Sequence, residues 1–270
     1  MLAACPPSDV LTAFGISYPA TRLSGGQGQT FRAGGWILKP APNPTENEWI
    51  AETVAELDQN GFRVARHKRA TSGAWVVSGW SAQEHLEGEH RAGTWPAIIE
   101  AGTALHRALA QIPRPTFLDA RTDPWAVADR VAWGEQSREA YPELADALAP
   151  LARRLRPVSQ PCQMIHGDLT GNVLFCEGQP PAVIDISPYW RPSAFAAAIV
   201  VIDALTWEGA DPGLLASVET LPEIDQLLLR AAIWRLVELE ETRRQSGREY
   251  SGALARHRST HHRLFETLPE

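Results

Sequence analysis

A short stretch in the second half of the chain carries carboxylate and amide side chains at close spacing. An apolar segment leads into His166-Gly167-Asp168, Asn172 follows after a Thr-Gly pair, and a later apolar segment ends at Asp185. A carboxylate in a turn can accept the proton of a hydroxyl group, and carboxylate and amide oxygens are the ligands that Mg²⁺ prefers. The pattern therefore predicts phosphoryl transfer, with Asp168 as the base and Asp185 and Asn172 as metal ligands. The alternative is that these residues only cap turns.

The same segment resembles the catalytic loop of aminoglycoside phosphotransferase-like kinases, a family of small-molecule kinases with a protein-kinase-like fold. His-Gly-Asp-Leu stands where protein kinases carry His-Arg-Asp-Leu, which favours a small-molecule acceptor. The chain departs from the family pattern in two places. The step from Asp168 to Asn172 is one residue shorter than in the kinase loop, and segment 193–198 lacks the carboxylate that the family carries after its metal Asp.

The resemblance implies an α+β, two-lobe fold. Residues 1–82 would form an N-terminal nucleotide-binding lobe, an antiparallel sheet with one helix. Residues 83–270 would form a mainly helical lobe that carries the catalytic and acceptor-binding residues. The resemblance also implies ATP as the phosphoryl donor and Mg²⁺ as the cofactor.

A glycine-rich segment near the N-terminus precedes a short strand pattern at 35–39. Glycines let backbone N–H groups approach phosphates, so Gly25, Gly26 and Gly28 are candidate phosphate contacts, although such segments are more often ordinary turns. Lys39 ends the strand, and the resemblance makes it the lysine that holds the nucleotide phosphates.

A helix is expected from Glu46 to Leu57, with Thr45 as its N-cap. The residue of this helix that pairs with Lys39 is either Glu46, on the apolar face, or Glu52, whose spacing from Lys39 is more usual in the family.

The segment from Gly79 to Gly88 resembles the linker between kinase lobes. Its candidate nucleotide contacts are Ala82, Gln83 and Glu84, and the alternative is a loop anchored by a buried Trp80. Farther on, apolar periodicity predicts a helix from Trp95 to Leu109, with His106 packed and hydrogen-bonded rather than catalytic.

Acceptor contacts are expected between that helix and the catalytic loop, and just after Asp185. The candidates are Trp125, Asp129, Arg130, Trp133 and Arg191. Aromatic and carboxylate groups together would hold a cationic or sugar-like acceptor. The competing interpretation makes both tryptophans core residues, Asp129-Arg130 a surface pair and Arg191 part of a structural ion pair.

Composition sets outer limits on the function. The 270 residues carry a net charge of −7, which argues against a nucleic-acid partner and favours a neutral or cationic acceptor. No apolar run is long enough for a membrane span, and the three separated cysteines suggest reduced thiols, so we expect a cytoplasmic protein. The histidines at 257, 261 and 262 are expected on a solvated helix, and the oligomeric state stays open.

These observations together predict a kinase that phosphorylates a hydroxyl group of a small molecule such as a sugar, amino sugar, aminoglycoside-like compound or amino alcohol. Two alternatives remain open at this point. One is a protein or peptide kinase, since the fold serves both kinds of acceptor. The other is a pseudokinase that binds nucleotide without turnover, because the catalytic loop is short.

Overall fold

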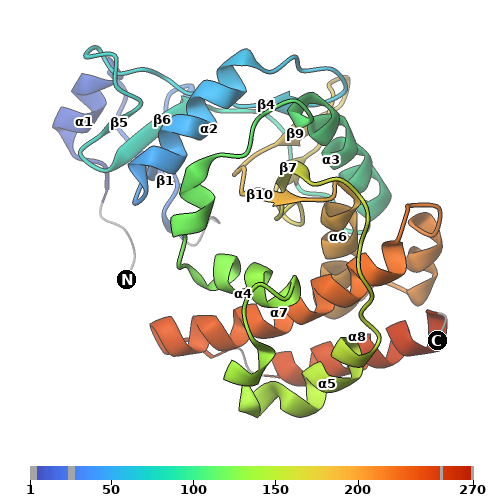
Figure 1. Ribbon diagram of the computed structural model, residues 1–270. Coiled ribbons are helices and arrows are strands. Elements are labelled where there is room, and N and C mark those ends of the chain that lie inside the picture. Colours follow the sequence, from blue (N-terminus) through green and yellow to red (C-terminus); the bar gives the residue numbers. More distant parts are fainter. Residues whose placement is uncertain (1–4, 24–27, 250–251, 269–270) are drawn as a thin grey trace. The chain divides into compact units, whose positions relative to one another are not determined.

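The computed structural model describes residues 5–23, 28–249 and 252–268, and the chain divides into two compact units (Figure 1). The sheet unit comprises Met1–Glu89 and Leu174–Asp185, and the helical unit comprises His90–Val173 and Ile186–Glu270. An antiparallel sheet in the N-terminal part and a mainly helical remainder give the α+β class that the sequence predicted.

A five-stranded antiparallel sheet forms the main layer of the sheet unit. Its strands are, in spatial order, β1 (Thr21–Arg22), β2 (Phe31–Ala33), β3 (Trp36–Pro40), β6 (Trp80–Glu84) and β5 (Val76–Val77). Leu38 in β3 pairs with Ala82 in β6, and both side chains are buried. The core continues into the short helix α1 (Ser8–Ala13) through Val10, and Trp80 packs edge-on against Phe31 with ring centroids 5.6 Å apart. Trp80 is therefore a core residue of a strand.

Helix α2 (Pro44–Glu56) follows β3 directly and begins two residues before the predicted start. Its N-cap is Asn43, whose side chain accepts a hydrogen bond from the Glu46 N–H at 3.3 Å, so the expected Thr45 cap is wrong. Pro44 explains the difference, because its fixed φ and missing N–H suit the first helical position. After α2, β4 (Arg63–Val64) pairs in parallel with β9 (Ala182–Val183), and β8 (Val173–Leu174) lies where the chain enters the second segment of the sheet unit.

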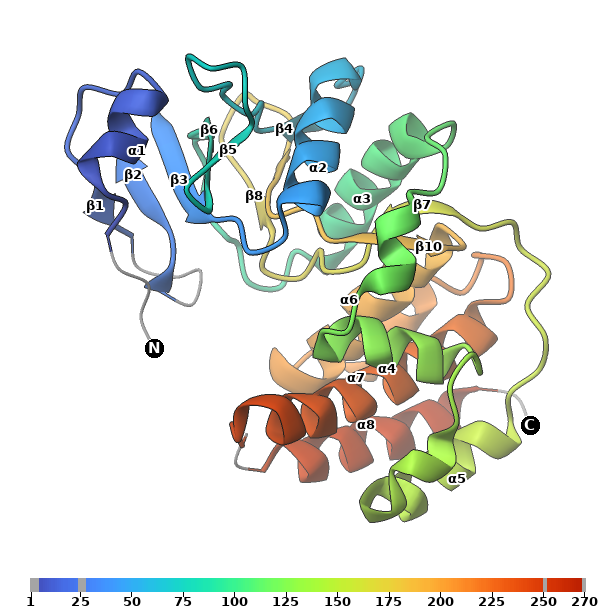
Figure 2. The same ribbon diagram turned by 60° about the vertical axis from the view of Figure 1, so that its left-hand side comes forward.

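The helical unit is built around one long helix. In both views α7 (Ile224–Ser246) lies between α4 (Pro124–Ala132) and α8 (Ala253–Thr267), and it contacts both (Figures 1 and 2). It also packs against α5 (Ala145–Arg153) and α6 (Ala194–Trp207). The helical unit also contains short 3₁₀ turns at Thr116–Ala120, Arg138–Ala140, Pro142–Leu144 and Pro212–Ser217.

Two helices and a two-stranded sheet surround the predicted catalytic segment. Helix α3 (Trp95–Leu109) has the predicted bounds, and the apolar run from Phe195 to Leu205 is buried along α6 as predicted. Strand β7 (Gln163–His166) pairs antiparallel with β10 (Pro188–Arg191), with Pro188 opposite His166. This pairing fixes the strand end from which the His-Gly-Asp turn leaves.

The prediction of a solvated C-terminal histidine helix is wrong for two of its three histidines. His257 and His261 are buried on the face of α8 that packs against α6 and α7, whereas His262 is exposed and lies 3.2 Å from Glu266. Positions 257, 261 and 264 follow the helical period and form one stripe, and arginines elsewhere on α8 masked this pattern in the sequence. Within the described ranges, no helix is both long and apolar enough to cross a bilayer.

Candidate active site

The His-Gly-Asp turn is held by hydrogen bonds that the histidine makes. His166 is fully buried, and its Nδ1 accepts from the backbone N–H groups of Asp168 and Ser187, both at 3.2 Å. The backbone N–H of His166 donates to Nε2 of His106 at 3.0 Å, which confirms His106 as a packed, hydrogen-bonded residue. Burial lowers the pKa of His106 to about 3, with His166 adding to the effect. His106 therefore stays neutral and keeps its acceptor nitrogen.

Glycine at position 167 has a steric cause. A Cβ at Gly167 would lie 2.4 Å from the ring of Tyr189, the residue of β10 that packs over the turn. A side chain at this position would therefore push β10 away from β7. Close packing of the Tyr189 ring explains why the turn reads His-Gly-Asp.

The Asp168 carboxylate is exposed but already oriented. Its Oδ2 accepts from Nδ2 of Asn172 at 3.2 Å, and its Oδ1 accepts from Nη2 of Arg235 at 3.1 Å. Asn172 also donates to the backbone carbonyl of Asp168 at 2.6 Å, so the shortened loop closes on itself. The nitrogen of Asn172 is used in these bonds, and its oxygen is the atom that suits a metal ion.

Arg235 and Asp203 are the polar residues of this site that the sequence analysis missed. Nε and Nη2 of Arg235, on α7, donate to the two carboxylate oxygens of Asp203, on α6, at 2.7 and 2.6 Å. Burial raises the pKa of Asp203, and Arg235 opposes that rise. We refer to Arg235, Asp203 and Asp168 as the Arg235 cluster. The available signal was a single carboxylate inside the apolar run of α6, because a buried carboxylate requires a partner.

The sheet unit brings two of the predicted residues together. Lys39 in β3 forms a salt bridge with Asp185, which lies two residues beyond β9 and has a left-handed φ of 53°. Glu46 accepts a hydrogen bond from Nδ2 of Asn43 at 3.2 Å, and Glu52 lies on the exposed face of α2. Lys39 thus contacts the predicted metal ligand Asp185.

The other predicted nucleotide contacts belong to the glycine-rich segment and to strand β6. Gly25 and Gly26 fall outside the described residues, whereas Gly28 has a φ of 70° and its carbonyl accepts from Arg22. Strand β6 runs through Glu84, so Ala82, Gln83 and Glu84 lie in a strand. Within it, the Ala82 carbonyl accepts from the Lys68 N–H at 2.8 Å, and the Glu84 N–H donates to the Arg66 carbonyl at 2.9 Å. The nucleotide contacts of these residues stay a prediction.

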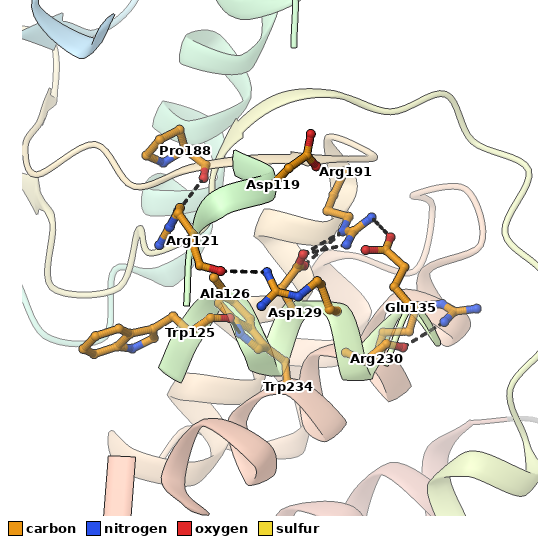
Figure 3. Close-up of polar contacts among 12 residues, drawn as sticks. Asp119, Arg121, Trp125, Ala126, Asp129, Glu135, Pro188, Arg191, Arg230 and Trp234 are labelled. Atoms are coloured by element: carbon orange, nitrogen blue, oxygen red, sulfur yellow. Dashed lines mark hydrogen bonds and ion pairs between the residues drawn. The ribbon is translucent and has the colours of Figure 1, made fainter. Parts of the chain in front are cut away.

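The predicted acceptor residues centre on a second arginine (Figure 3). Nε of Arg191 donates to Oδ1 of Asp129 at 3.0 Å, Nη2 donates to Oδ2 at 2.6 Å, and Nη1 donates to Glu135 at 2.7 Å. We refer to Arg191, Asp129 and Glu135 as the Arg191 cluster. Burial raises the pKa of Asp129, and the contacts from Arg191 oppose the rise. The predicted Asp129-Arg130 surface pair is therefore wrong, because Asp129 is buried and bonded to Arg191.

The remaining acceptor candidates differ in exposure. Trp125 is 36% exposed, and Trp133 is partly buried with the guanidinium groups of Arg191 and Arg230 over its ring. Nη1 of Arg130 donates to the Arg121 carbonyl at 3.0 Å. A cavity of about 210 Å³ is lined by Asp129, Arg130 and Arg191. Both oxygens of Asp129 accept hydrogen bonds from Arg191, and the contact of Asp129 with an acceptor stays a prediction.

Comparison with known proteins agrees with this geometry. Residues 19–186 match the model of the phosphotransferase enzyme family, and no curated protein sequence matches the chain. Among solved structures, an aminoglycoside phosphotransferase from Alicyclobacillus acidocaldarius subsp. acidocaldarius DSM 446 aligns with a TM-score of 0.61 and 14% identity, over 98% of this chain and 95% of that chain.

Two further structures share the fold. A spectinomycin phosphotransferase in complex with ADP and spectinomycin aligns with a TM-score of 0.55 and 13% identity, over 97% of this chain and 93% of that chain. A choline/ethanolamine kinase family protein from Mesorhizobium loti aligns with a TM-score of 0.56 and 16% identity, over 94% of this chain and 90% of that chain. The family match covers more than half of the 270 residues. The chain belongs to the phosphotransferase enzyme family and is a phosphotransferase with an alcohol group as its acceptor.

Proposed function

We propose that this protein transfers the γ-phosphoryl group of ATP, with Mg²⁺, to a hydroxyl group of a small molecule. The observation that carries the proposal is the exposed Asp168 carboxylate, oriented by Asn172 and Arg235 in the turn after β7. A related fold solved with ADP supports an adenine nucleotide as the donor.

Asp168 acts as the general base in the proposed reaction. The acceptor oxygen attacks the γ-phosphorus, and a new P–O bond forms while the bond to the β–γ bridging oxygen breaks. The hydroxyl proton passes to the Asp168 carboxylate, and the products are the phosphorylated acceptor and ADP. Such proton transfer contributes roughly 10²- to 10⁴-fold to a rate.

The residues assigned to the metal and the nucleotide fit those groups chemically. Asp185 and Asn172 supply hard oxygen atoms of the kind that bind Mg²⁺, and the salt bridge from Lys39 to Asp185 supports an ionised carboxylate there. Bound Mg²⁺ would offset the charge that builds up on the phosphates. Lys39 would hold the nucleotide phosphates through its ammonium group.

The acceptor is proposed to be a neutral or cationic hydroxyl compound, such as a sugar, amino sugar, aminoglycoside-like compound or amino alcohol. The net charge of −7 supports this class. Asp129 lines the cavity beside Arg191 and stays a candidate contact of the acceptor. Trp125, the exposed aromatic residue on α4, is the remaining candidate for stacking on the acceptor.

Phosphoryl transfer from radiolabelled MgATP tests the proposal directly. The protein is incubated with the compounds named above, with a peptide library and with water alone as acceptor. We expect label on at least one small hydroxyl compound. Label on peptides only would assign a protein kinase. Nucleotide binding without transfer to any acceptor, water included, would assign a non-catalytic binding module.

Magnesium titrations test the metal ligands separately. Asp185→Ala should abolish the magnesium dependence of nucleotide binding, whereas Asn172→Ala should be milder, because the short loop binds the Asn172 side chain to Asp168. Asp58→Ala, at an exposed carboxylate of the sheet unit, is the matched control and should behave as the wild type. A larger defect in Asn172→Ala than in Asp185→Ala would reverse the ranking of the two ligands.

A further inference from the structure

We propose that Arg235 is a positioning residue for the catalytic carboxylate Asp168, and that Asp203 holds Arg235 in place for this purpose. The inference rests on the proposed function, in which Asp168 is the base. It assigns a role in the reaction to two residues on helices α6 and α7.

The contact with Asp203 fixes the plane of the Arg235 guanidinium group independently of Asp168. Arg235 meets Asp203 through two nitrogens, at 2.7 and 2.6 Å, and a two-point contact of this kind sets the orientation of the planar group as well as its position. Nη2 then lies 3.1 Å from Oδ1 of Asp168. Arg235 therefore presents one N–H at a fixed place to one oxygen of the catalytic carboxylate.

Exposure separates the two halves of the Arg235 cluster. The side chains of Arg235 and Asp203 are 9% and 6% exposed, and that of Asp168 is 44% exposed. The buried pair is already balanced in charge without Asp168. A contact to an exposed carboxylate adds little to stability. Orientation of the Asp168 carboxylate therefore explains the hydrogen bond from Arg235 better than a contribution to folding stability does.

The contact would act on the orientation of Asp168. Together with Asn172 on the other oxygen, it stops rotation of the carboxylate, so the remaining lone pairs keep one direction toward the acceptor hydroxyl. The role that we assign to Arg235 is therefore a geometric one.

The first test compares two buried arginines of α7. Arg235→Gln should lower kcat by roughly 10- to 100-fold, as expected for a misplaced reacting group, with KM for MgATP unchanged. Arg235→Lys, which keeps a positively charged donor at this place, should restore part of kcat. Arg230 is the matched control, because its guanidinium donates to the backbone carbonyls of Ala132 and Arg156. Arg230→Gln should lower stability but keep the wild-type kcat.

A second variant guards against loss of folding. Asp203→Leu combined with Arg235→Met removes both buried charges, which is generally tolerated in protein interiors, and it also removes the contact to Asp168. It should fold and still show the low kcat with an unchanged KM for MgATP. Wild-type kcat in this variant, or in a folded Arg235→Gln protein, would overturn the proposal.

Crystal structures separate this inference from the proposed function. The orientation of the Asp168 carboxylate is compared among the wild type, Arg235→Gln and Arg230→Gln. A carboxylate that is rotated or disordered only in Arg235→Gln supports the positioning contact, even if the wild type transfers no phosphoryl group and the proposed function fails. An unchanged Asp168 carboxylate in Arg235→Gln overturns the positioning role whatever the activity.

Discussion

The helical unit contains two arginine-centred clusters with nearly the same construction. In each, a buried arginine bridges a buried aspartate and an exposed carboxylate. The arginines are 9% and 11% exposed, the inner aspartates 6% and 10%, and the outer carboxylates 44% and 48%, for the Arg235 and Arg191 clusters respectively. Distances and burial alone therefore do not tell the two clusters apart.

The clusters differ in what the outer carboxylate belongs to. Asp168 lies in the turn after β7, and Asn172 donates to its other oxygen. Glu135 follows the end of α4, where its backbone N–H donates to the Arg130 carbonyl at 2.8 Å. The Arg235 cluster thus ends at an oriented carboxylate in the proposed catalytic turn, and the Arg191 cluster joins α4 to β10. The same set of arginine contacts can therefore orient a reacting group or hold two secondary-structure elements together.

Replacing the outer carboxylates should give the largest difference between the clusters. Asp168→Asn should lower turnover by roughly 10²- to 10⁴-fold, because the amide cannot act as the base, and should leave MgATP affinity unchanged. Glu135→Gln should leave turnover unchanged and alter the free energy of unfolding by less than about 1 kcal/mol. Steady-state kinetics, nucleotide titration and urea unfolding of the two variants measure these effects. Equal turnover in both variants would contradict the distinction between the clusters.

Breaking the buried pairs should instead give similar losses of stability. Asp129→Asn and Asp203→Asn each leave an arginine without its buried partner, which typically costs about 3–5 kcal/mol of unfolding free energy. Replacing the whole pair, as Asp129→Leu with Arg191→Met, should recover most of that loss because no buried charge remains unpaired. Urea unfolding compares the single and double variants. A double variant no more stable than its single parent would show that the Arg191 cluster is needed for more than charge balance.

Acidification should give a smaller and graded effect, and one of its sources, the buried histidines of α8, lies beside the Arg235 cluster. Burial lowers the pKa of His257 to about 3, with His261 and Arg235 adding to the effect, and burial lowers the pKa of His261 to about 4. In the unfolded chain these groups take up protons near pH 6.5, before the folded chain does. Since the unfolded state binds more protons below pH 6.5, stability should fall with falling pH by about 1.4 kcal/mol per unit for each histidine, until its folded pKa is reached.

Unfolding of single variants at pH 7.5, 6.5 and 5.5 isolates this contribution. His257→Leu should flatten the pH dependence, and His262→Leu, at the exposed neighbour, should not. If both variants keep the wild-type slope, the buried imidazole of His257 is not a source of acid sensitivity.

Local signals in the sequence accounted for much of the fold and for one part of the site. Apolar periodicity gave α3 its bounds, and the strand–turn pattern placed His166-Gly167-Asp168 at the end of β7. These features depend on residues close together in the chain. The apolar period did not predict Asn43 as the N-cap of α2, because Pro44 starts the helix two residues before the predicted start.

The errors and omissions concern contacts between distant elements. Asp203 and Arg235 are 32 residues apart on different helices, and Asp129 and Arg191 are 62 apart. Helical periodicity shows which residues share a face, but it does not show which two faces meet. The burial of His257 was missed for the same reason, because only the packing of α8 against α6 and α7 decides which of its polar stripes is covered.

The packing of Tyr189 against Gly167 limits the mutational routes open to this chain. A single Gly167→Arg change would produce the His-Arg-Asp turn of protein kinases, but any Cβ there meets the Tyr189 ring at 2.4 Å. Tyr189 would have to become smaller first, and its ring also packs edge-on against Trp234, with centroids 5.3 Å apart. The intermediate would then carry a void in the core and gain nothing in return. The turn is therefore separated from its protein-kinase form by at least two substitutions, and the first of them, at Tyr189, weakens the core.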